Sequence, residues 1–497
     1  MSRSAAVIAA IDQGTTGTTV LLFDRRMGVV ARGYAELPQH FPRPGWVEHR
    51  GEEIWATTLR ALQGALRGAG ARRVRLEAIG ITNQRETTLL WDRATSRPVA
   101  PAIVWQDRRT ADRCATLRLA GLEPFARWRT GLRFDPYFSA TKVEWLLREH
   151  RALGARARRG ALAFGTVDSW LLWKLTGGAT HATDPTNASR TLLYDIRRAR
   201  WDADLTALFG VPSALLPEVR PSAGSFGVTR GVPGLPDGIP IRGVAGDQQA
   251  ALFGQGCVAA GGIKNTYGTG CFLMLHTGSR PVASRSGLLT TVACGPRGEI
   301  AYALEGSVFV AGAAIQWLRD GLGLIRNAGE SEALARTVPD SGGTHLVPAF
   351  AGLGAPHWRP DVRGLWCGIT RGTTRGHLAR AAIESIAFQT RDVVVAMERD
   401  AKRRVRRLLV DGGATSNGLL MQLQADLLGV PIVRPAMAES TALGAALLAG
   451  IGAGIWRRRE DAPLGARGAR TFRPRMAPAE RARRVRAWDD AVALLTG

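Results

Sequence analysis

The sequence predicts an α/β protein built from two similar halves, and three observations point to this fold class. Strand-like apolar runs alternate with helix-like stretches along the chain, which is typical of α/β folds. A hairpin pattern rich in glycine and threonine occurs near residue 12 and again near residue 264. The 497 residues exceed what a single hydrophobic core usually organises. We therefore expect two domains, each of which begins its own sheet.

The first half opens with a predicted hairpin. Residues 5–12 (AAVIAAID) and 18–24 (TTVLLFD) are apolar enough for buried strands, and the turn QGTTG joins them. The other predicted elements of this half have limits set by periodicity and by glycines. They are strands at 76–84 and 87–92 and helices at 139–150 and 167–178.

The second half repeats this opening. Residues 261–266 (GGIKNT) and 271–278 (CFLMLHTG) flank the turn YGTG. Residues 406–435 predict a strand, a glycine turn, a helix, a glycine stop and a second strand. Residues 442–456 are mostly alanine, glycine and leucine, which favours a closely packed helix.

We place the domain boundary in the glycine-rich stretch near residues 250–262. The predicted division is an N-terminal domain at 1–252, a C-terminal domain at 253–456 and a basic tail at 457–497. The tail ends in a predicted amphipathic helix at 479–495, which we expect on the surface and without a chemical role.

Composition narrows the function classes. No run of 18 or more apolar residues occurs, and the N-terminal apolar stretch is too short for a signal peptide, so no membrane span is expected. The five cysteines lack CxxC spacing, which predicts neither disulfides nor a zinc site and favours a cytoplasmic protein. The net charge of +24 raises the question of nucleic-acid binding. Because the arginines are spread along the chain and no nucleic-acid-binding motif occurs, we expect no specific nucleic-acid partner.

The first hairpin turn, DQGTTGTT from Asp12 to Thr19, has the features of a phosphate loop. Its glycines, among them Gly17, let backbone N–H groups approach an anion, and the hydroxyls of Thr15 and Thr16 add donors. Asp12 is a candidate Mg²⁺ ligand, because this ion prefers one or two carboxylates together with phosphate oxygens. Taken alone, such a turn is more often a plain hairpin.

Two stretches of the second half match this turn. NTYGTG, from Asn265 to Gly270, repeats the hairpin, and DGGATSNG, from Asp411 to Gly418, places a glycine turn between a strand and a helix start. Each is weak alone, but the three together predict ATP held from both sides. This arrangement is that of the duplicated actin-like (ribonuclease H-like) ATPase fold, with the active site in the cleft between two domains.

A separate set of residues predicts recognition of a small polyol. Arg85 and Glu86 lie side by side at the end of a strand, where a carboxylate can accept from hydroxyl groups and a guanidinium can donate to them. Tyr137 in DPYFS adds a phenol, and Trp105 in IVWQD adds an apolar wall. The structural alternative for Arg85 and Glu86 is a surface ion pair of little energetic value.

Over about residues 7–455 the sequence resembles the FGGY carbohydrate kinase family, and in particular its members that phosphorylate glycerol. The stretches that carry this resemblance are DQGTTGTT, GITNQRETT, IVWQDRRT, DPYFSATK, DSWLLWKLTGG, TDPTNASRTLLYD, GDQQAALFGQ, KNTYGTGCF, ALEGSVFVAGAAIQWLRD, VPAFAGLGAPHW, RAAIESIAFQTRDV and VDGGATSN. Family members that act on xylulose differ at the NQRETT and DPYFS positions.

The resemblance implies an activity, its ligands and a set of site residues. The activity is ATP-dependent phosphorylation of glycerol to sn-glycerol 3-phosphate, with Mg²⁺ and with a homodimer or homotetramer as the assembly. The residues implied at the glycerol site are Arg85, Glu86, Tyr137, Asp247, Gln248, Trp105, Phe272 and Thr15. Those implied at the nucleotide site are Thr15, Thr16, Gly17, Thr19, Thr269, Gly312, Gln316, Gly413 and Asn417. The predicted metal ligands are Asp12 and Asp247.

The sequence departs from the family pattern in two regions. Gly17 stands where these kinases commonly have Ser, and Thr19 stands where they commonly have Arg. The loss of a guanidinium near the phosphates predicts weaker nucleotide binding or a less stabilised transition state. TRGVPGLPDG lacks the Gly-Lys-Gly-type loop through which some bacterial members bind fructose 1,6-bisphosphate, so we do not expect that control.

Asp247 is the predicted general base. It is the only side chain in residues 243–262 that is charged at neutral pH, and it precedes a predicted helix. Phosphoryl transfer needs one group to take the proton of the attacking hydroxyl, and a lone carboxylate that no neighbour neutralises suits this role. The alternative is that Asp247 caps its helix. We expect Gly246 to permit a sharp turn, and Ala250 and Ala251 to pack this helix at the domain junction.

Two other functions stay open from the sequence. An FGGY kinase for another small polyol or ketose would carry the same phosphate loops, and an ADP-release assay over a polyol panel would separate it. An actin-like ATPase that transfers phosphate only to water would need no polyol residues, so its hydrolysis would be independent of any polyol.

Overall fold

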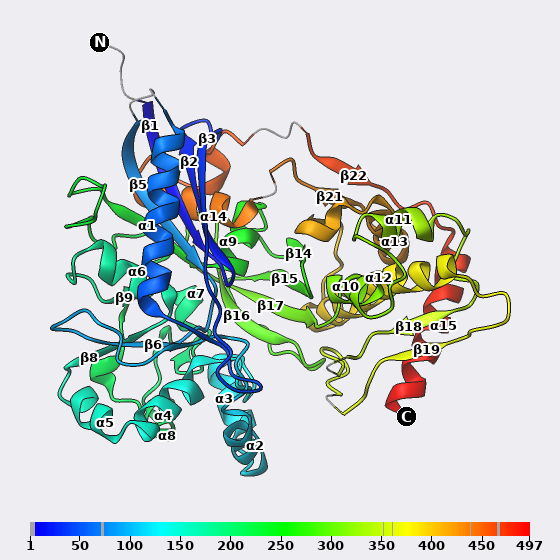
Figure 1. The fold of residues 1–497 in the computed structure, drawn as a ribbon, viewed down its shortest axis with the longest axis horizontal. Helices are drawn as coiled ribbons and strands as arrows, with labels where there is room; N and C mark the ends of the chain where they lie inside the picture. The colour runs from blue at the N-terminus through cyan, green and yellow to red at the C-terminus, as the bar shows by residue number, and fades with distance from the viewer. Residues whose placement is uncertain (1–4, 71–73, 351, 360, 438, 465–467) are drawn as a thin grey trace.

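The computed structural model describes residues 5–70, 74–350, 352–359, 361–437, 439–464 and 468–497. Two large mixed sheets stand side by side, one in each half of the chain, and both pack against helices (Figure 1). The predicted α/β class with two halves is confirmed.

The first sheet has five strands in the order β13-β5-β1-β2-β3. β1 (Ala5–Gln13), β2 (Gly17–Asp24) and β3 (Val29–Glu36) form an antiparallel meander. β5 (Val74–Asn83) and β13 (Ile241–Gly246) continue the sheet parallel to β1. Alternate residues of β1 enter two different cores, so both faces of this sheet are covered.

The second sheet repeats this topology in seven strands, ordered β16-β17-β15-β14-β20-β21-β22. β14 (Ile263–Tyr267) takes the place of β1, with antiparallel β15 (Cys271–Gly278) and β17 (Ile300–Val308) on one side. Parallel β20 (Leu408–Asp411) and β21 (Ile432–Arg434) follow on the other side. The repeated hairpin of the sequence is therefore the start of a repeated sheet. The added edge strands are β16 (Leu289–Cys294) and β22 (Arg470–Phe472).

Helix α14 (Ser440–Gly452) comes late in the chain but packs on the first sheet. Helix α1 (Gly51–Gly68) covers the opposite face, and Figure 1 shows α14 in orange beside the blue strands. The helix approaches so closely that a Cβ atom on Gly80 would lie 2.2 Å from the Ala445 carbonyl oxygen. The predicted close packing of 442–456 is confirmed, and the two halves interlock. The division of the chain near residue 252 stays a prediction.

Helix α9 (Asp247–Gly254) lies between the sheets and contacts α14 directly. A Cβ atom on Gly444 would lie 1.9 Å from the carbonyl oxygen of Ala250, and one on Gly254 would lie 2.2 Å from that of Ser440. Only glycine permits this separation of the two helices. Ala250 and Ala251 are both buried, and Ala250 belongs to the core that contains α14, while their place at a domain junction stays a prediction.

The remaining elements surround this framework. In the first half they are β4 (Glu48–His49), β6 (Leu89–Asp92), β7 (Ala102–Ile103), α2 (Ala111–Leu119), α3 (Glu123–Thr130), α4 (Ser139–Glu149), α5 (Arg151–Arg158), β8 (Leu162–Gly165), α6 (Val167–Leu175), β9 (Ala182–Thr183), α7 (Pro185–Ala188), β10 (Tyr194–Asp195), β11 (Arg200–Trp201), α8 (Ala203–Leu208), η1 (Ser213–Leu215) and β12 (Glu218–Val219). In the second half they are α10 (Gly312–Asp320), α11 (Glu330–Ala335), β18 (His345–Val347), β19 (Leu365–Cys367), α12 (Arg375–Ala401), η2 (Gly413–Ser416), α13 (Gly418–Leu428), η3 (Arg459–Asp461) and α15 (Pro478–Thr496).

The C-terminal helix α15 is present as predicted, but it is more than a surface helix. Trp488 is 1% exposed and stacks on Phe388 of α12 with the ring centroids 5.1 Å apart. Its ring N–H donates to Asp392 at 2.8 Å. Within the described part of the chain, none of the helices combines the length and the apolar character needed to cross a membrane.

The contact between α14 and α9 gives a stability prediction. We expect Gly444→Ala to lower the free energy of unfolding by about 1–3 kcal/mol, because the added methyl group overpacks the contact with Ala250. Gly64→Ala in α1 is the matched control, since its Cβ would meet Gly33 at an ordinary 3.6 Å. This control should be neutral or gain up to about 1 kcal/mol from helix propensity. Urea unfolding measures both, and equal stability of Gly444→Ala and wild type would contradict the packing account.

Candidate active site

The predicted site residues gather at one edge of the first sheet. Asp12 lies at the end of β1, Arg85 and Glu86 follow β5, and Asp247 follows β13. Because these three strands are parallel, their carboxyl ends meet at the same edge. Side chains from three distant stretches of sequence therefore converge.

Arg85 lies at the centre of a buried charge network. Its Nη1 donates to Glu305 Oε2 at 2.6 Å and to Gln249 at 3.2 Å, and its Nη2 donates to the Tyr137 hydroxyl at 3.3 Å. Its Nε lies 3.2 Å from Asp247 Oδ1. The Arg85 side chain is only 2% exposed, so the predicted alternative of a surface ion pair is wrong.

Glu86 is held in an unusual backbone conformation. Its φ is +61°, in the left-handed region that costs a non-glycine residue about 1–3 kcal/mol. Its carbonyl oxygen accepts from the hydroxyls of Thr88 and Ser139, both at 3.0 Å. Its side-chain Oε1 accepts from Arg190 Nε at 2.6 Å. These contacts fix the direction in which the Glu86 carboxylate points.

Asp247 is the first residue of α9 but not its N-cap. The cap position is Gly246, and Asp247 Oδ1 accepts from the backbone N–H of Gln248 at 2.6 Å. Gly246 joins β13 directly to α9 with a φ of −61°, a conformation that any residue adopts, so this turn does not itself require glycine. Glycine is needed there because a Cβ atom would lie 2.7 Å from Arg85 Cγ.

The prediction that no neighbour neutralises Asp247 is wrong, because Arg85 Nε lies 3.2 Å away. Burial nevertheless raises the pKa of Asp247 above its ordinary value, against the opposing effect of Arg85. Gln248, the next residue, accepts with its side-chain oxygen from Lys264 of the second half. Asp247 thus lies where the two halves meet.

Aromatic side chains form a wall beside these charges. The Trp105 ring centroid is 5.6 Å from that of Tyr137 and 6.3 Å from that of Phe272. The indole N–H of Trp105 donates to the Thr15 hydroxyl at 2.9 Å. Because Thr15 lies in the first hairpin and Phe272 follows the second, this wall connects the two hairpins.

Asp12 has the properties of a cation ligand. Burial, followed by the charges of Asp247 and Glu439, raises its pKa from 3.8 to about 8. A carboxylate that is short of positive charge in this way fits a divalent cation. Among the described residues no group of three or more acidic, His or Cys side chains could hold a metal. The predicted ligands Asp12 and Asp247 suit Mg²⁺ in their chemistry, because this ion prefers one or two carboxylates together with phosphate oxygens.

The second hairpin packs against the start of α10. The N–H groups of Gly312 and Ala313 donate to the carbonyl oxygens of Gly268 and Thr269, both at 3.0 Å. A Cβ atom on Gly312 would lie 2.6 Å from the Gly268 oxygen, which requires glycine at this position. The Gly312 N–H is therefore already used within the protein, while Thr269 and Gln316 of α10 are exposed.

The third glycine turn lies against the same hairpin. Gly412 has a φ of +91°, and a Cβ atom there would lie 2.3 Å from the Tyr267 carbonyl oxygen. Gly413 is exposed, with nothing within 4 Å of its Cβ position. Asn417 caps α13 through its side-chain oxygen, which accepts from Leu420 N at 2.9 Å. The structure thus brings together the three stretches of the second half that were predicted to bind the nucleotide.

Tyr34 lies beside Gly17 and Thr19, the two positions at which the sequence departs from the family pattern. Thr19 pairs with Tyr34 across β2 and β3. A Cβ atom on Gly17 would lie 2.5 Å from the Tyr34 hydroxyl oxygen, so this phenol fills the space of a side chain at position 17. Thr16, beside them, is exposed.

Four residues that contact the predicted site residues were not singled out from the sequence: Arg190, Glu305, Lys264 and Gln249. The side chains of Arg190 and Glu305 are fully buried. Each is a single charge in an uncharged stretch, NASRTLLY and AYALEGSVFVAGAA. The criterion that singled out Asp247 also applies to Glu305, which is the one charged residue of 300–318, but it does not reveal which residues Glu305 contacts.

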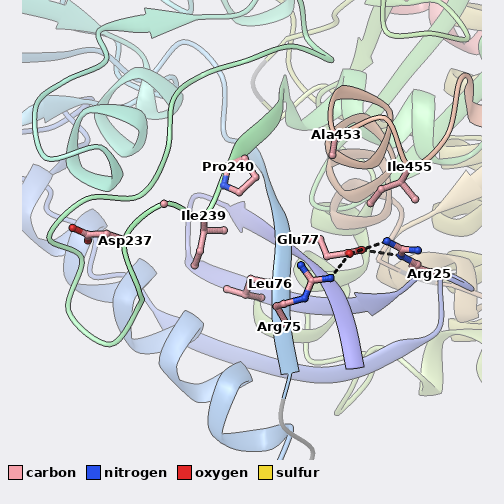
Figure 2. A pocket seen from close by; sticks show the side chains of 10 residues that line it. Arg25, Arg75, Leu76, Glu77, Asp237, Ile239, Pro240, Ala453 and Ile455 are labelled. Carbon is pink, nitrogen blue, oxygen red and sulfur yellow. Dashed lines mark hydrogen bonds and ion pairs between the residues drawn. The ribbon is translucent and has the colours of Figure 1, made fainter. Parts of the chain in front are cut away.

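A cavity of about 460 Å³ lies at the other end of the first sheet (Figure 2). Arg75 and Glu77 at the start of β5 and Arg25 after β2 line it. Both guanidinium groups pair with Glu77 Oε1, at 2.8 Å from Arg25 and 2.7 Å from Arg75. None of the predicted site residues lines this cavity, and we assign no function to it.

Comparisons with known proteins identify a family. The models of the FGGY family of carbohydrate kinases match residues 7–254 with the N-terminal domain and residues 263–453 with the C-terminal domain. The chain is 54% identical over 490 residues to the glycerol kinase of Myxococcus xanthus, covering 98% of this chain and 99% of that protein. It is 57% identical over 485 residues to the glycerol kinase of Alkalilimnicola ehrlichii, covering 98% and 97%. It matches the crystal structure of Plasmodium falciparum glycerol kinase with ADP at a TM-score of 0.94 and 35% identity, over 99% and 98% of the two chains.

The raised pKa of Asp12 gives a pH-dependent stability prediction. Without divalent cations, unfolded Asp12 loses its proton near pH 4, whereas folded Asp12 keeps it to about pH 8. The unfolding free energy of wild type should therefore fall across this window, because the folded state binds the extra proton. Asp12→Asn removes this fall and should gain stability relative to wild type as the pH rises from about 4 to about 8. Urea unfolding in a chelator measures the difference, and parallel curves for the two proteins would contradict it.

Proposed function

The chain belongs to the FGGY family of carbohydrate kinases, and from this premise we propose that it transfers the γ-phosphoryl group of ATP to a terminal hydroxyl of glycerol. The products are sn-glycerol 3-phosphate and ADP. The observation that supports this function most is the convergence of Arg85, Glu86, Tyr137 and Asp247 beside an aromatic wall, next to a phosphate-loop hairpin. An ATPase that uses only water would need no such set of residues.

The polyol pocket combines charge, a phenol and aromatic surface. The carboxylates of Glu86 and Asp247 accept from glycerol hydroxyls, and Arg85 and Tyr137 donate to them. Trp105 and Phe272 face the carbon atoms. Gln248 is held by Lys264 and borders the same space. A pocket of buried hydrogen-bonding groups discriminates strongly against molecules that leave those groups unpaired.

Asp247 acts as the general base. Its carboxylate takes the proton of the attacking hydroxyl as the new bond to phosphorus forms. Burial raises its pKa, which makes it a better proton acceptor than an exposed carboxylate. Its place at the start of α9 and its contact with Arg85 hold it in one orientation.

The nucleotide lies between the two hairpins. The first contributes Thr15, Thr16, Gly17 and Thr19, and the second contributes Thr269. The other nucleotide residues are in the second half: Gly312, Gln316, Gly413 and Asn417. Asp12 and Asp247 would hold Mg²⁺, which neutralises phosphate charge when bound. Four of these nine residues, Thr16, Thr269, Gln316 and Gly413, are exposed, which suits a ligand that enters from solvent.

We also propose an oligomeric state and a cellular location. The family resemblance suggests a homodimer or a homotetramer, and we place the protein in the cytoplasm. All five cysteines are unpaired, as suits a reducing compartment.

Glycerol turnover by the purified protein tests the function. We expect ADP release with Mg-ATP to require glycerol and to yield sn-glycerol 3-phosphate as the product. A panel of small polyols and ketoses in the same assay should give slower turnover at equal concentration. ADP release at the same rate without any polyol, or a faster rate with another member of the panel, would contradict the proposed substrate.

Asp247→Asn tests the role of the base. We expect the variant to fold and to bind glycerol but to lose about 10²–10⁴-fold in kcat, because the amide cannot accept the proton. Asp237→Asn is the matched control, since Asp237 lies at the distant cavity of Figure 2. It should turn over like wild type. A kcat close to wild type in Asp247→Asn would remove Asp247 from this role.

A further inference from the structure

Glu305 reaches from the second half into the polyol site of the first half. It lies on β17 between Met274 of β15 and Leu289 of β16, in the interior of the second sheet. Its side chain is 0% exposed. A carboxylate so deeply buried needs partners of opposite charge.

Those partners are two arginines of the first half. Glu305 Oε2 accepts from Arg85 Nη1 at 2.6 Å, and Oε1 accepts from Arg190 Nη2 at 2.9 Å. Arg190 is itself fully buried and donates through Nε to Glu86 at 2.6 Å. One carboxylate of the second half therefore reaches both members of the predicted polyol pair, Arg85 directly and Glu86 through Arg190.

The geometry shows what Glu305 prevents. Both Nη atoms of Arg85 point to Glu305, with Oε1 also 3.4 Å from Nη2, and only Nε faces Asp247. Without the charge of Glu305, the Nη atoms would keep the contacts to the uncharged Gln249 and Tyr137 side chains, at 3.2 and 3.3 Å. A two-pronged pair with the charged Asp247 carboxylate would then be the stronger interaction for the guanidinium. That pair would use the donors and the acceptor that the polyol needs.

We propose that Glu305 is a positioning residue for the polyol, which aims Arg85 directly and Glu86 through Arg190 from across the boundary between the two halves. It does not touch the substrate. The inference rests on the proposed function and assigns to the second half a part in polyol recognition as well as in nucleotide binding.

Glu305→Gln tests the proposal, because it keeps the shape and removes the charge. Loss of hydrogen bonds to a charged group predicts a rise of about 10–150-fold in the glycerol KM and in the glycerol dissociation constant measured by titration calorimetry. The dissociation constant of ATP without glycerol should stay within about twofold of wild type, since the hydrogen bonds of the Glu305 side chain go to Arg85 and Arg190. Glu305→Asp, which keeps the charge, should recover part of the glycerol affinity.

Glu384→Gln is the matched control. Glu384 is a buried carboxylate of the second half, paired with Arg380 at 2.8 Å and with Arg484 at 3.3 Å, away from the site. A merely structural ion pair would cost stability in both variants and leave the glycerol affinity unchanged. Only Glu305→Gln should raise the glycerol dissociation constant.

A second variant keeps the test valid if Glu305→Gln does not fold. Arg190→Gln combined with Glu305→Gln removes one buried charge of each sign, and it should fold while the glycerol dissociation constant stays raised. The role of Glu305 would be overturned if the folded single or double variant bound glycerol with wild-type affinity. It would also be overturned if the variant lost affinity for glycerol and for ATP to the same extent. Wild type without glycerol turnover would instead overturn the proposed function itself.

Discussion

Two guanidinium groups and two carboxylates are buried together where the halves of the chain meet, and the active site is built around them. Arg85, Glu86 and Arg190 come from the first half and Glu305 from the second. Burying four charges is costly unless each finds a partner at short range, so the strands and loops that carry them have little freedom to shift. Burial raises the pKa of Glu305, but Arg190 and Arg85 outweigh this effect and lower it to about 2. The carboxylate therefore stays charged at any physiological pH.

The charge network also separates the site into two parts. Arg85 and Glu86 are buried, and the aromatic wall lies against them. Thr16, Thr269, Gln316 and Gly413 are exposed. A small alcohol can thus lie in a place poor in water, while a larger charged nucleotide can approach the exposed residues from solvent. Exclusion of water from the alcohol side favours transfer to the hydroxyl over hydrolysis.

Local patterns predicted the fold class, the opening hairpin of each sheet and part of the site. Both hairpins, the strands at β5 and β20 and the helices α4 and α6 follow from periodicity and glycines, which act over a few residues. The network could not be predicted this way, because Arg85 and Glu305 are 220 residues apart and Glu86 and Arg190 are 104 apart. Gly246 was misinterpreted for the same reason: it makes room for Arg85, a residue that is distant in sequence. The packing of α14 on the first sheet is likewise a long-range contact.

The central claim is that Asp247 meets the reacting hydroxyl inside this network. A crystal structure with glycerol and a non-hydrolysable ATP analogue measures this most directly. The account predicts a terminal glycerol oxygen about 2.6–3.2 Å from an Asp247 carboxylate oxygen, with the analogue's γ-phosphoryl group on its far side between the two hairpins. Glycerol bound beyond hydrogen-bonding reach of Asp247, or a nucleotide outside the space between the hairpins, would contradict it.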